Sequence, residues 1–85
     1  MENFTQIKLR HIEEKLKHIR TRDGDRKVLA EVHERNLSAL VGHQYGSTAR
    51  SQLLIKHSLE LRELASFYAD LWAKMIARQK EELDR

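Results

Sequence analysis

A long heptad pattern in the second half of the chain constrains the fold more than any other feature. Side chains spaced alternately three and four residues apart line one side of an α-helix and form the seam along which helices pack. Over three repeats this spacing is held by Leu54, His57, Leu61, Leu64, Tyr68, Leu71 and Met75. Ala65 and Trp72 lie beside this seam and widen it to a stripe of roughly 140°. The pattern therefore predicts a long helix that packs against another helix.

Residues that end helices are confined to two places in the chain. Proline is absent from the 85 residues, and the three glycines are Gly24, Gly42 and Gly46. Gly24 can take the positive φ that ends a helix, and Asp25 can cap the helix that follows. The stretch 42–48 combines two glycines with a serine and a threonine that can cap the next helix. The sequence therefore predicts three helices, at about 3–20, 26–41 and 48–80.

We expect an all-α fold in a single domain that covers residues 1–85. The two short helices should form an antiparallel hairpin, because a brief connection leaves neighbouring helices antiparallel. This hairpin is expected to pack against the long carboxyl-terminal helix with its coiled-coil-like heptads. The seam of the first helix is predicted at Thr5, Leu9, Ile12, Leu16 and Ile19. A weaker second face holds Phe4, Ile7, His11 and His18, and it either covers another surface or is solvated. The short helices cannot cover the whole long helix, so another surface is expected to do so.

The composition narrows the classes of protein. Cysteine is absent, which leaves no disulfides or thiolate metal sites and favours a reducing compartment, so we expect a cytoplasmic protein. No apolar run is longer than that at 53–55, which is far shorter than the roughly 18 residues of a membrane span. Charged residues make up 34% of the chain, and the formal net charge is +3. This mildly basic balance permits a nucleic-acid partner without requiring one.

No spacing in the sequence carries catalytic chemistry. A nucleophile, a base and an orienting acid cannot be placed together, so we predict that the protein is not an enzyme and has neither a cofactor nor a small-molecule substrate. His11, Glu14 and His18 could converge on one helix face and offer ligands to a zinc-like ion. Lys15 and Lys17 would repel that cation, so we interpret the group as solvated and predict no metal site.

Two polar residues fall on predicted apolar faces. His57 lies among the leucines of the heptad seam, either as a neutral core histidine bonded to a group such as Tyr68 or as a pH-sensitive group at an interface. Asn36 lies on the apolar face of the second helix, where it either fixes the register of the helices or bonds water at a loose contact.

Apolar residues that the seam leaves over are the predicted contacts to a partner. Ile55 and Leu59 lie four residues apart, about 100° to 140° around the helix from the seam. Phe67 lies on another flank, Trp72 lies at the edge of the seam, and Tyr45 lies in the loop. The alternative is that Ile55, Leu59 and Phe67 are scattered surface hydrophobes and that Tyr45 folds over the end of the core.

These observations lead to a functional prediction. We expect a non-enzymatic helical protein–protein interaction module, such as a small adaptor, chaperone or regulator, that forms a homodimer and binds another protein. The alternative is a nucleic-acid-associated regulator that binds phosphates through the basic first helix. Its contacts would be Lys8, Arg10, Lys15, Lys17, Arg20 and Arg22. Acidic residues interleave with these groups, which would also fit a solvated helical face.

Overall fold

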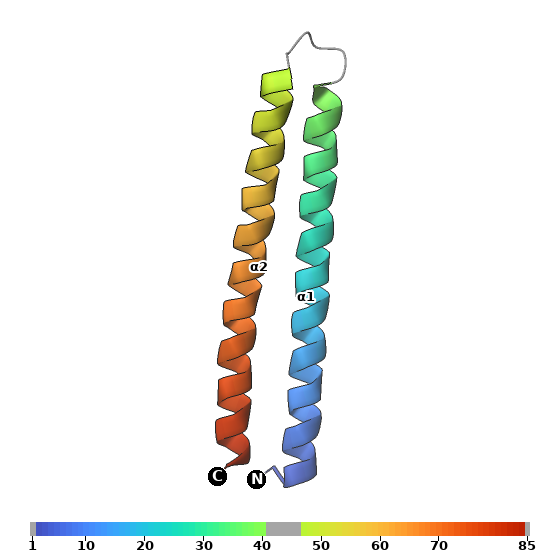
Figure 1. The fold of residues 1–85 in the computed structure, drawn as a ribbon. Coiled ribbons are helices and arrows are strands. Elements are labelled where there is room, and N and C mark those ends of the chain that lie inside the picture. Colours follow the sequence, from blue (N-terminus) through green and yellow to red (C-terminus); the bar gives the residue numbers. More distant parts are fainter. Residues whose placement is uncertain (1, 41–46, 85) are drawn as a thin grey trace.

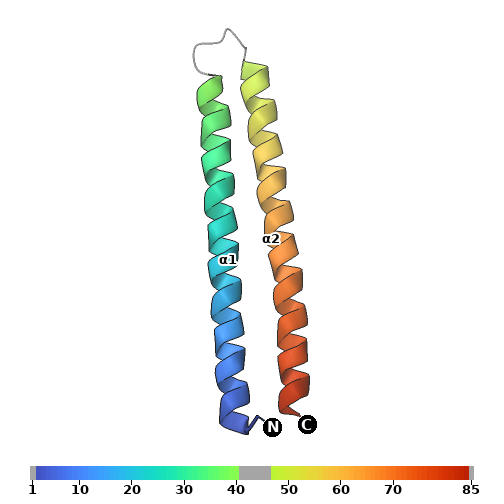
Figure 2. The ribbon, with the colours of Figure 1, turned by 180° about the vertical axis from the view of Figure 1, so that it is seen from behind.

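Two long helices lie side by side and form an elongated hairpin (Figure 1). In this computed structural model, residues 2–40 and 47–84 are described. Helix α1 spans Phe4–Ala39 and helix α2 spans Ser47–Leu83. The helices run antiparallel, so the two termini lie at the same end in views from opposite sides (Figures 1 and 2). The hairpin measures 65 × 16 × 11 Å.

A capping box fixes the start of α1. The Asn3 side chain accepts a hydrogen bond of 2.8 Å from the Gln6 amide, and the Gln6 side chain accepts one of 3.0 Å from the Asn3 amide. These reciprocal bonds satisfy donors that a helix start otherwise leaves unpaired. At the other end, the Leu40 amide donates to the Leu37 carbonyl over 3.1 Å. Local hydrogen bonds therefore fix both ends of α1.

The prediction of three helices is wrong, because the expected helices 3–20 and 26–41 are one continuous helix. Thr21, in the expected connection, donates its hydroxyl to the Lys17 carbonyl one turn earlier over 2.9 Å. Asp25 does not cap a new helix and instead accepts a hydrogen bond from Tyr68. Glycine inside a helix costs only about 1 kcal/mol relative to alanine. Unbroken α1 offsets this cost by packing along the whole length of α2.

The two helices meet along a repeat of eleven residues rather than seven. On α1 the repeat is His11, Arg22 and His33, and on α2 it is His57, Tyr68 and Gln79. The residues of α2 that are at least half-buried continue this spacing from Ala49 to Glu82, at a mean of about 3.7 residues. Such a spacing does not produce the left-handed supercoil that heptads impose. Two nearly straight helices therefore pack against each other.

This repeat explains why the predicted seams are only partly correct. A heptad stripe drifts by about 20° per heptad on a straight helix, so on α2 it crosses the contact with α1 instead of following it. His57 and Tyr68 are buried there, whereas Leu54, Leu61 and Leu71 are exposed.

On α1, most of the expected seam does not contact α2, and only its last member, Ile19, is half-buried beside α2. Leu9, Ile12 and Leu16 are 55%, 52% and 45% exposed. The weaker face of the predicted helix, which holds His11 and His18, packs against α2 instead. Asn36, expected on an apolar face, is exposed.

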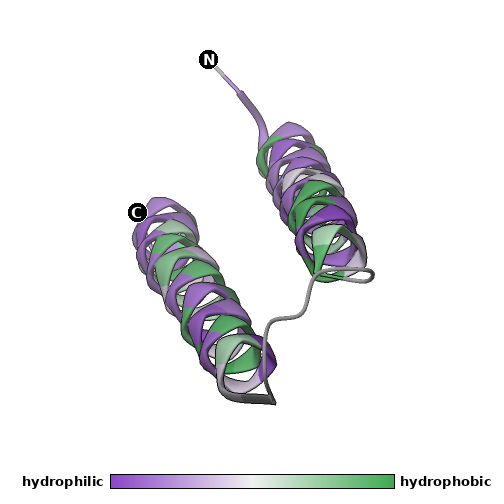
Figure 3. Ribbon diagram, turned by 90° about the horizontal axis from the view of Figure 1, so that it is seen from above, coloured by the Kyte–Doolittle hydropathy of each residue, from purple (hydrophilic) through white to green (hydrophobic). Residues whose placement is uncertain are grey.

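Hydrophobic residues are therefore distributed around both helices (Figure 3). In the described part of the chain, Tyr68 is the one buried hydrophobic residue. The other buried side chains there are polar: His11, His33, His57 and Gln79. Neither of the two described helices has an apolar stretch long enough to cross a membrane.

Replacing Gly24 by alanine tests the continuous helix. Apart from the neighbouring residues and backbone of α1 itself, no atom lies within 4 Å of the position that a Cβ would occupy, so Gly24→Ala should stabilise the protein by about 0.5 to 1 kcal/mol. The measurement is urea unfolding followed by the far-ultraviolet helical signal. Destabilisation would show that Gly24 sits in a turn, as the three-helix fold requires.

Candidate functional site

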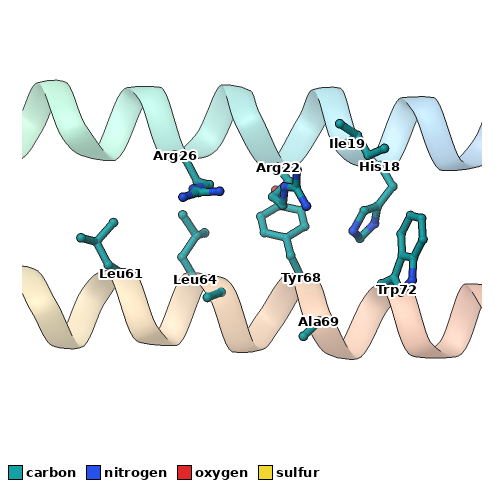
Figure 4. Close-up of a pocket in the computed structure, with 10 residues that line it drawn as sticks. His18, Ile19, Arg22, Arg26, Leu61, Leu64, Tyr68, Ala69 and Trp72 are labelled. Carbon is teal, nitrogen blue, oxygen red and sulfur yellow. The ribbon is translucent and has the colours of Figure 1, made fainter.

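A groove of about 570 Å³ lies between the helices near the middle of the hairpin. Both helices contribute residues that are spaced three and four apart. The groove is lined by His18, Ile19, Arg22, Arg26, Leu61, Leu64, Ala65, Tyr68, Ala69 and Trp72. Figure 4 shows Arg22, Arg26 and His18 of α1 facing Leu61, Leu64, Tyr68 and Trp72 of α2. The groove combines an apolar floor with two guanidinium groups.

Tyr68 anchors the floor of the groove. Its hydroxyl donates a hydrogen bond to the Asp25 carboxylate, which lies across the interface on α1. This bond, together with burial, raises the pKa of Tyr68. His18 packs edge-on against the Tyr68 ring, with centroids 5.5 Å apart, and lies 5.1 Å from the Trp72 ring. These contacts hold the aromatic residues in fixed positions and leave the groove open beside them.

A cluster of charges joins the helices at the end where the termini lie. Arg10 and Arg78 both bind Glu14 and Glu82, so each arginine contacts carboxylates on both helices. The His11 Nε2 atom lies 3.2 Å from Glu82. Hydrogen bonds, first from Arg10 and then from His11, hold the pKa of Glu82 at about 2. Glu82 is therefore ionised at neutral pH, and this cluster is already electrostatically satisfied.

Two histidine rings stack near the opposite end. The His33 and His57 rings lie 3.8 Å apart with an angle of 12° between their planes, and the residues are only 7% and 5% exposed. The His33 Nε2 atom and both ring nitrogens of His57 lack a hydrogen-bond partner. Glu60 lies 3.5 Å from His33, which is beyond a good hydrogen bond. Burial and the neighbouring His33 lower the pKa of His57.

His11 and His18, the two histidines considered as candidate metal ligands, do not lie together in the described structure. His11 faces Glu82, whereas His18 faces Tyr68 and Trp72, so the two do not converge as one helix face could have brought them. Across residues 2–40 and 47–84, no group of three histidine, aspartate or glutamate side chains is arranged to hold a metal ion.

The predicted partner contacts fall on different surfaces. Ile55 and Leu59 are 62% and 50% exposed. Each lies two residues from buried His57, roughly 160° around α2, so both are on the outer face of the hairpin. Phe67 is also exposed, Trp72 lines the groove, and Tyr45 lies outside the described residues.

The basic residues predicted to contact phosphates are not gathered on one face. Arg10 binds Glu2, Glu14 and Glu82, and the Lys8 ammonium lies 4.5 Å from the Phe4 ring centroid. Arg22 lines the groove and contacts Asp23. Lys17 and Arg20 lie three residues apart, about 60° around the helix, and share a face, whereas Lys15 lies about 160° from Lys17. The six residues therefore do not all lie on one face of α1.

Sequence reasoning missed the two arginines of the groove as part of an apolar site. Arg22 was grouped with the exposed basic residues, and Arg26 was placed at the start of a separate helix. The signal that could have found Arg22 is its spacing of eleven residues from both His11 and His33. Arg26 lies four residues after Arg22, one turn further along the same face of α1.

Acid should weaken the hairpin through His57. The pKa of His57 is lower in the folded protein than its ordinary value of 6.5, so below pH 6.5 the unfolded chain binds more protons. Stability should therefore be full above pH 6.5 and decrease as the pH falls from 6.5 towards the lowered value.

Thermal melts at pH 7, 6 and 5 measure this effect. The melting temperature of the wild-type protein should fall by several degrees across the series, and that of His57→Leu should fall clearly less. Because the pKa of Glu82 is lowered from 4.5 to about 2, its contribution to stability is lost mainly as the pH falls from 4.5 towards 2, and it changes little between pH 7 and 5. If the melting temperature falls equally with pH in the wild-type protein and in His57→Leu, then His57 is not the source of the acid sensitivity.

Comparison with known proteins identifies no relative. No protein-family model matches the chain, no curated protein matches its sequence, and no solved structure matches its fold. The functional argument therefore depends on the residues of this chain alone.

Proposed function

We propose that the protein is a non-enzymatic helical interaction module that acts as a homodimer and also binds another protein. The observation that carries this proposal is the amount of apolar surface that the hairpin leaves uncovered. Twelve large hydrophobic residues in the described part of the chain are exposed, against one that is buried. A helix that is hydrophobic on several sides is normally covered on several sides. One contact between two helices covers one side only.

The energetic argument favours association. Fully burying a leucine, isoleucine or phenylalanine side chain contributes about 1.5 to 3 kcal/mol, so covering the exposed half of one contributes about 1 kcal/mol. Five or six such residues on one surface would exceed the lower estimates of the entropic cost of association, about 4 kcal/mol. Exposed apolar surface of this extent is typical of protein interaction sites.

The two predicted roles would use different faces. The groove side carries apolar residues on both helices and suits a second helical hairpin. The outer face of α2 carries Ile55 and Leu59, with Ala73 and Ala77 on the same face about four turns further along the helix, and it suits a further helical partner. The nucleic-acid alternative has less support, because the basic residues of α1 point in several directions and Arg10 is neutralised by three carboxylates.

Self-association is the first test of the proposal. Sedimentation equilibrium at micromolar concentrations should give twice the chain mass of 10.1 kDa. A monomer across the whole range would contradict the homodimer. Binding to generic duplex DNA that weakens steeply with added salt would instead support the nucleic-acid alternative.

The outer face is tested by Ile55→Asp combined with Leu59→Asp. Both side chains point away from α1, so the helical signal and the cooperativity of melting should stay close to those of the wild-type protein. Gln52→Asp combined with Ser66→Asp, at two exposed polar positions of α2, is the matched control for two added charges. If the double variant unfolds while the control remains folded, Ile55 and Leu59 belong to a core and the outer face is not a free surface.

A further inference from the structure

The groove side of the hairpin carries a stripe of apolar and small residues along α2. The stripe lies on the same side of the hairpin as the groove, because four residues of the stripe also line the groove. The stripe consists of Leu54, Ser58, Leu61, Ala65, Ala69, Trp72 and Ile76. On α1, Ile19 lines the same groove, and Ile12 and Leu16 lie within two turns on the same flank. The surface is therefore built from both helices.

The stripe on α2 pairs large residues with small ones about Ala65. Four residues away on either side lie Leu61 and Ala69, and seven residues away lie Ser58 and Trp72. Eleven residues away, two bulky residues, Leu54 and Ile76, close the ends of the stripe. A two-fold axis at Ala65 would set each member of a pair against the other on the partner. Large side chains would then face small ones, which is how facing helices interdigitate.

The same axis places opposite charges together on α1. The contacts between the helices fix which residues lie at the same level: His33 with His57, and His11 with Gln79. Eight residues inward from the His33–His57 pair, Asp25 of α1 lies at the same height along the hairpin as Ala65 of α2. A two-fold axis that runs across the hairpin at Ala65 therefore passes α1 at Asp25. Asp23 then lies opposite the partner's Lys27. Both side chains are exposed, and both continue the flank of Ile19 at spacings of four residues.

We infer that the groove side of the hairpin binds a second copy of this chain in antiparallel orientation, with α2 against α2 around a two-fold axis at Ala65. The side of the hairpin is 65 Å long and 16 Å wide, on the order of 1,000 Å², and a stable interface needs about 800 Å² from each partner. The axis lies near the middle of both helices, so the two copies overlap along nearly their whole length. This inference rests on the proposed homodimer and adds its surface and orientation.

A single introduced cysteine tests the axis, because the chain has no cysteine of its own. Ala65→Cys places two thiols face to face where the α2 helices cross, within reach of a disulfide. Mild oxidation should convert most of this variant into a covalent dimer. Phe67→Cys, at almost the same level but on the opposite flank of α2, should remain largely monomeric on a non-reducing gel. Crosslinking of both variants to the same extent would overturn the proposed surface.

A distance measurement decides the orientation independently of disulfide geometry. A spin label at Glu81→Cys lies 16 residues beyond Ala65, so the two labels of an antiparallel dimer should be about 48 Å apart along the axis. If both loops lay at the same end, the separation would be no more than about two helix diameters, 25 Å. The shorter distance would overturn the orientation and leave the homodimer standing. Absence of any coupling between labels, with a monomeric mass, would overturn both.

Charge reversal tests the contact between Asp23 and the partner's Lys27. Asp23→Lys should weaken dimerisation at least several-fold at low salt, because it sets like charges together across the interface. Asp23→Lys combined with Lys27→Asp should restore the wild-type dissociation constant. An equally weak dimer in the double variant would show that these residues do not face each other.

Discussion

The pairing of α1 with α2 along an eleven-residue repeat is the constraint on which the rest of the structure depends. His11, Arg22 and His33 on α1 lie level with the α2 repeat of His57, Tyr68 and Gln79 in reverse order. At each end of the repeat the pair is in contact, through the stacked rings at one end and the hydrogen bond from Gln79 to the His11 carbonyl at the other. The buried positions at the centre of the contact thus carry polar side chains and one aromatic ring, that of Tyr68. The leucines and isoleucines of both helices are displaced to the flanks.

A polar contact of this kind favours one register over others more than it adds stability. The Tyr68 hydroxyl finds its acceptor only when Asp25 lies across from it, and the four-residue charge cluster requires Arg10 and Arg78 at one level. Shifting one helix by a turn would leave these buried or half-buried groups unpaired, which is costly. By contrast, the ring nitrogens of His57 and the Nε2 atom of His33 are buried without a hydrogen-bond partner, which destabilises the hairpin. Stability must then come largely from covering the apolar flanks, and this connects the fold to the proposed dimer.

The high helical content could be predicted from the sequence, because the absence of proline and the small number of glycines leave few alternatives. Most of the loop predicted at 42–48 lies outside the described residues, and Ser47 and Thr48 already belong to α2. The continuity of α1 through Gly24 could not be predicted, since a glycine followed by an aspartate fits both a turn and the interior of a helix that is held by tertiary contacts. The heptad seam failed for a related reason: leucine spacing on one helix does not reveal whether the partner helix follows the same period. Trp72 was recognised as a residue at the edge of the seam, but the groove itself depends on α1 lying beside α2 over its full length, which no local pattern contains.

The central claim is that this chain forms straight two-helix hairpins that pair side by side. Small-angle X-ray scattering tests it most directly, because mass and length come from the same curve. The account predicts a particle of twice 10.1 kDa whose longest dimension stays near the 65 Å of one hairpin. A particle of single mass with a much shorter longest dimension would indicate a folded-back three-helix monomer, and a doubled mass with a nearly doubled length would indicate end-to-end contact. Either result would contradict the account.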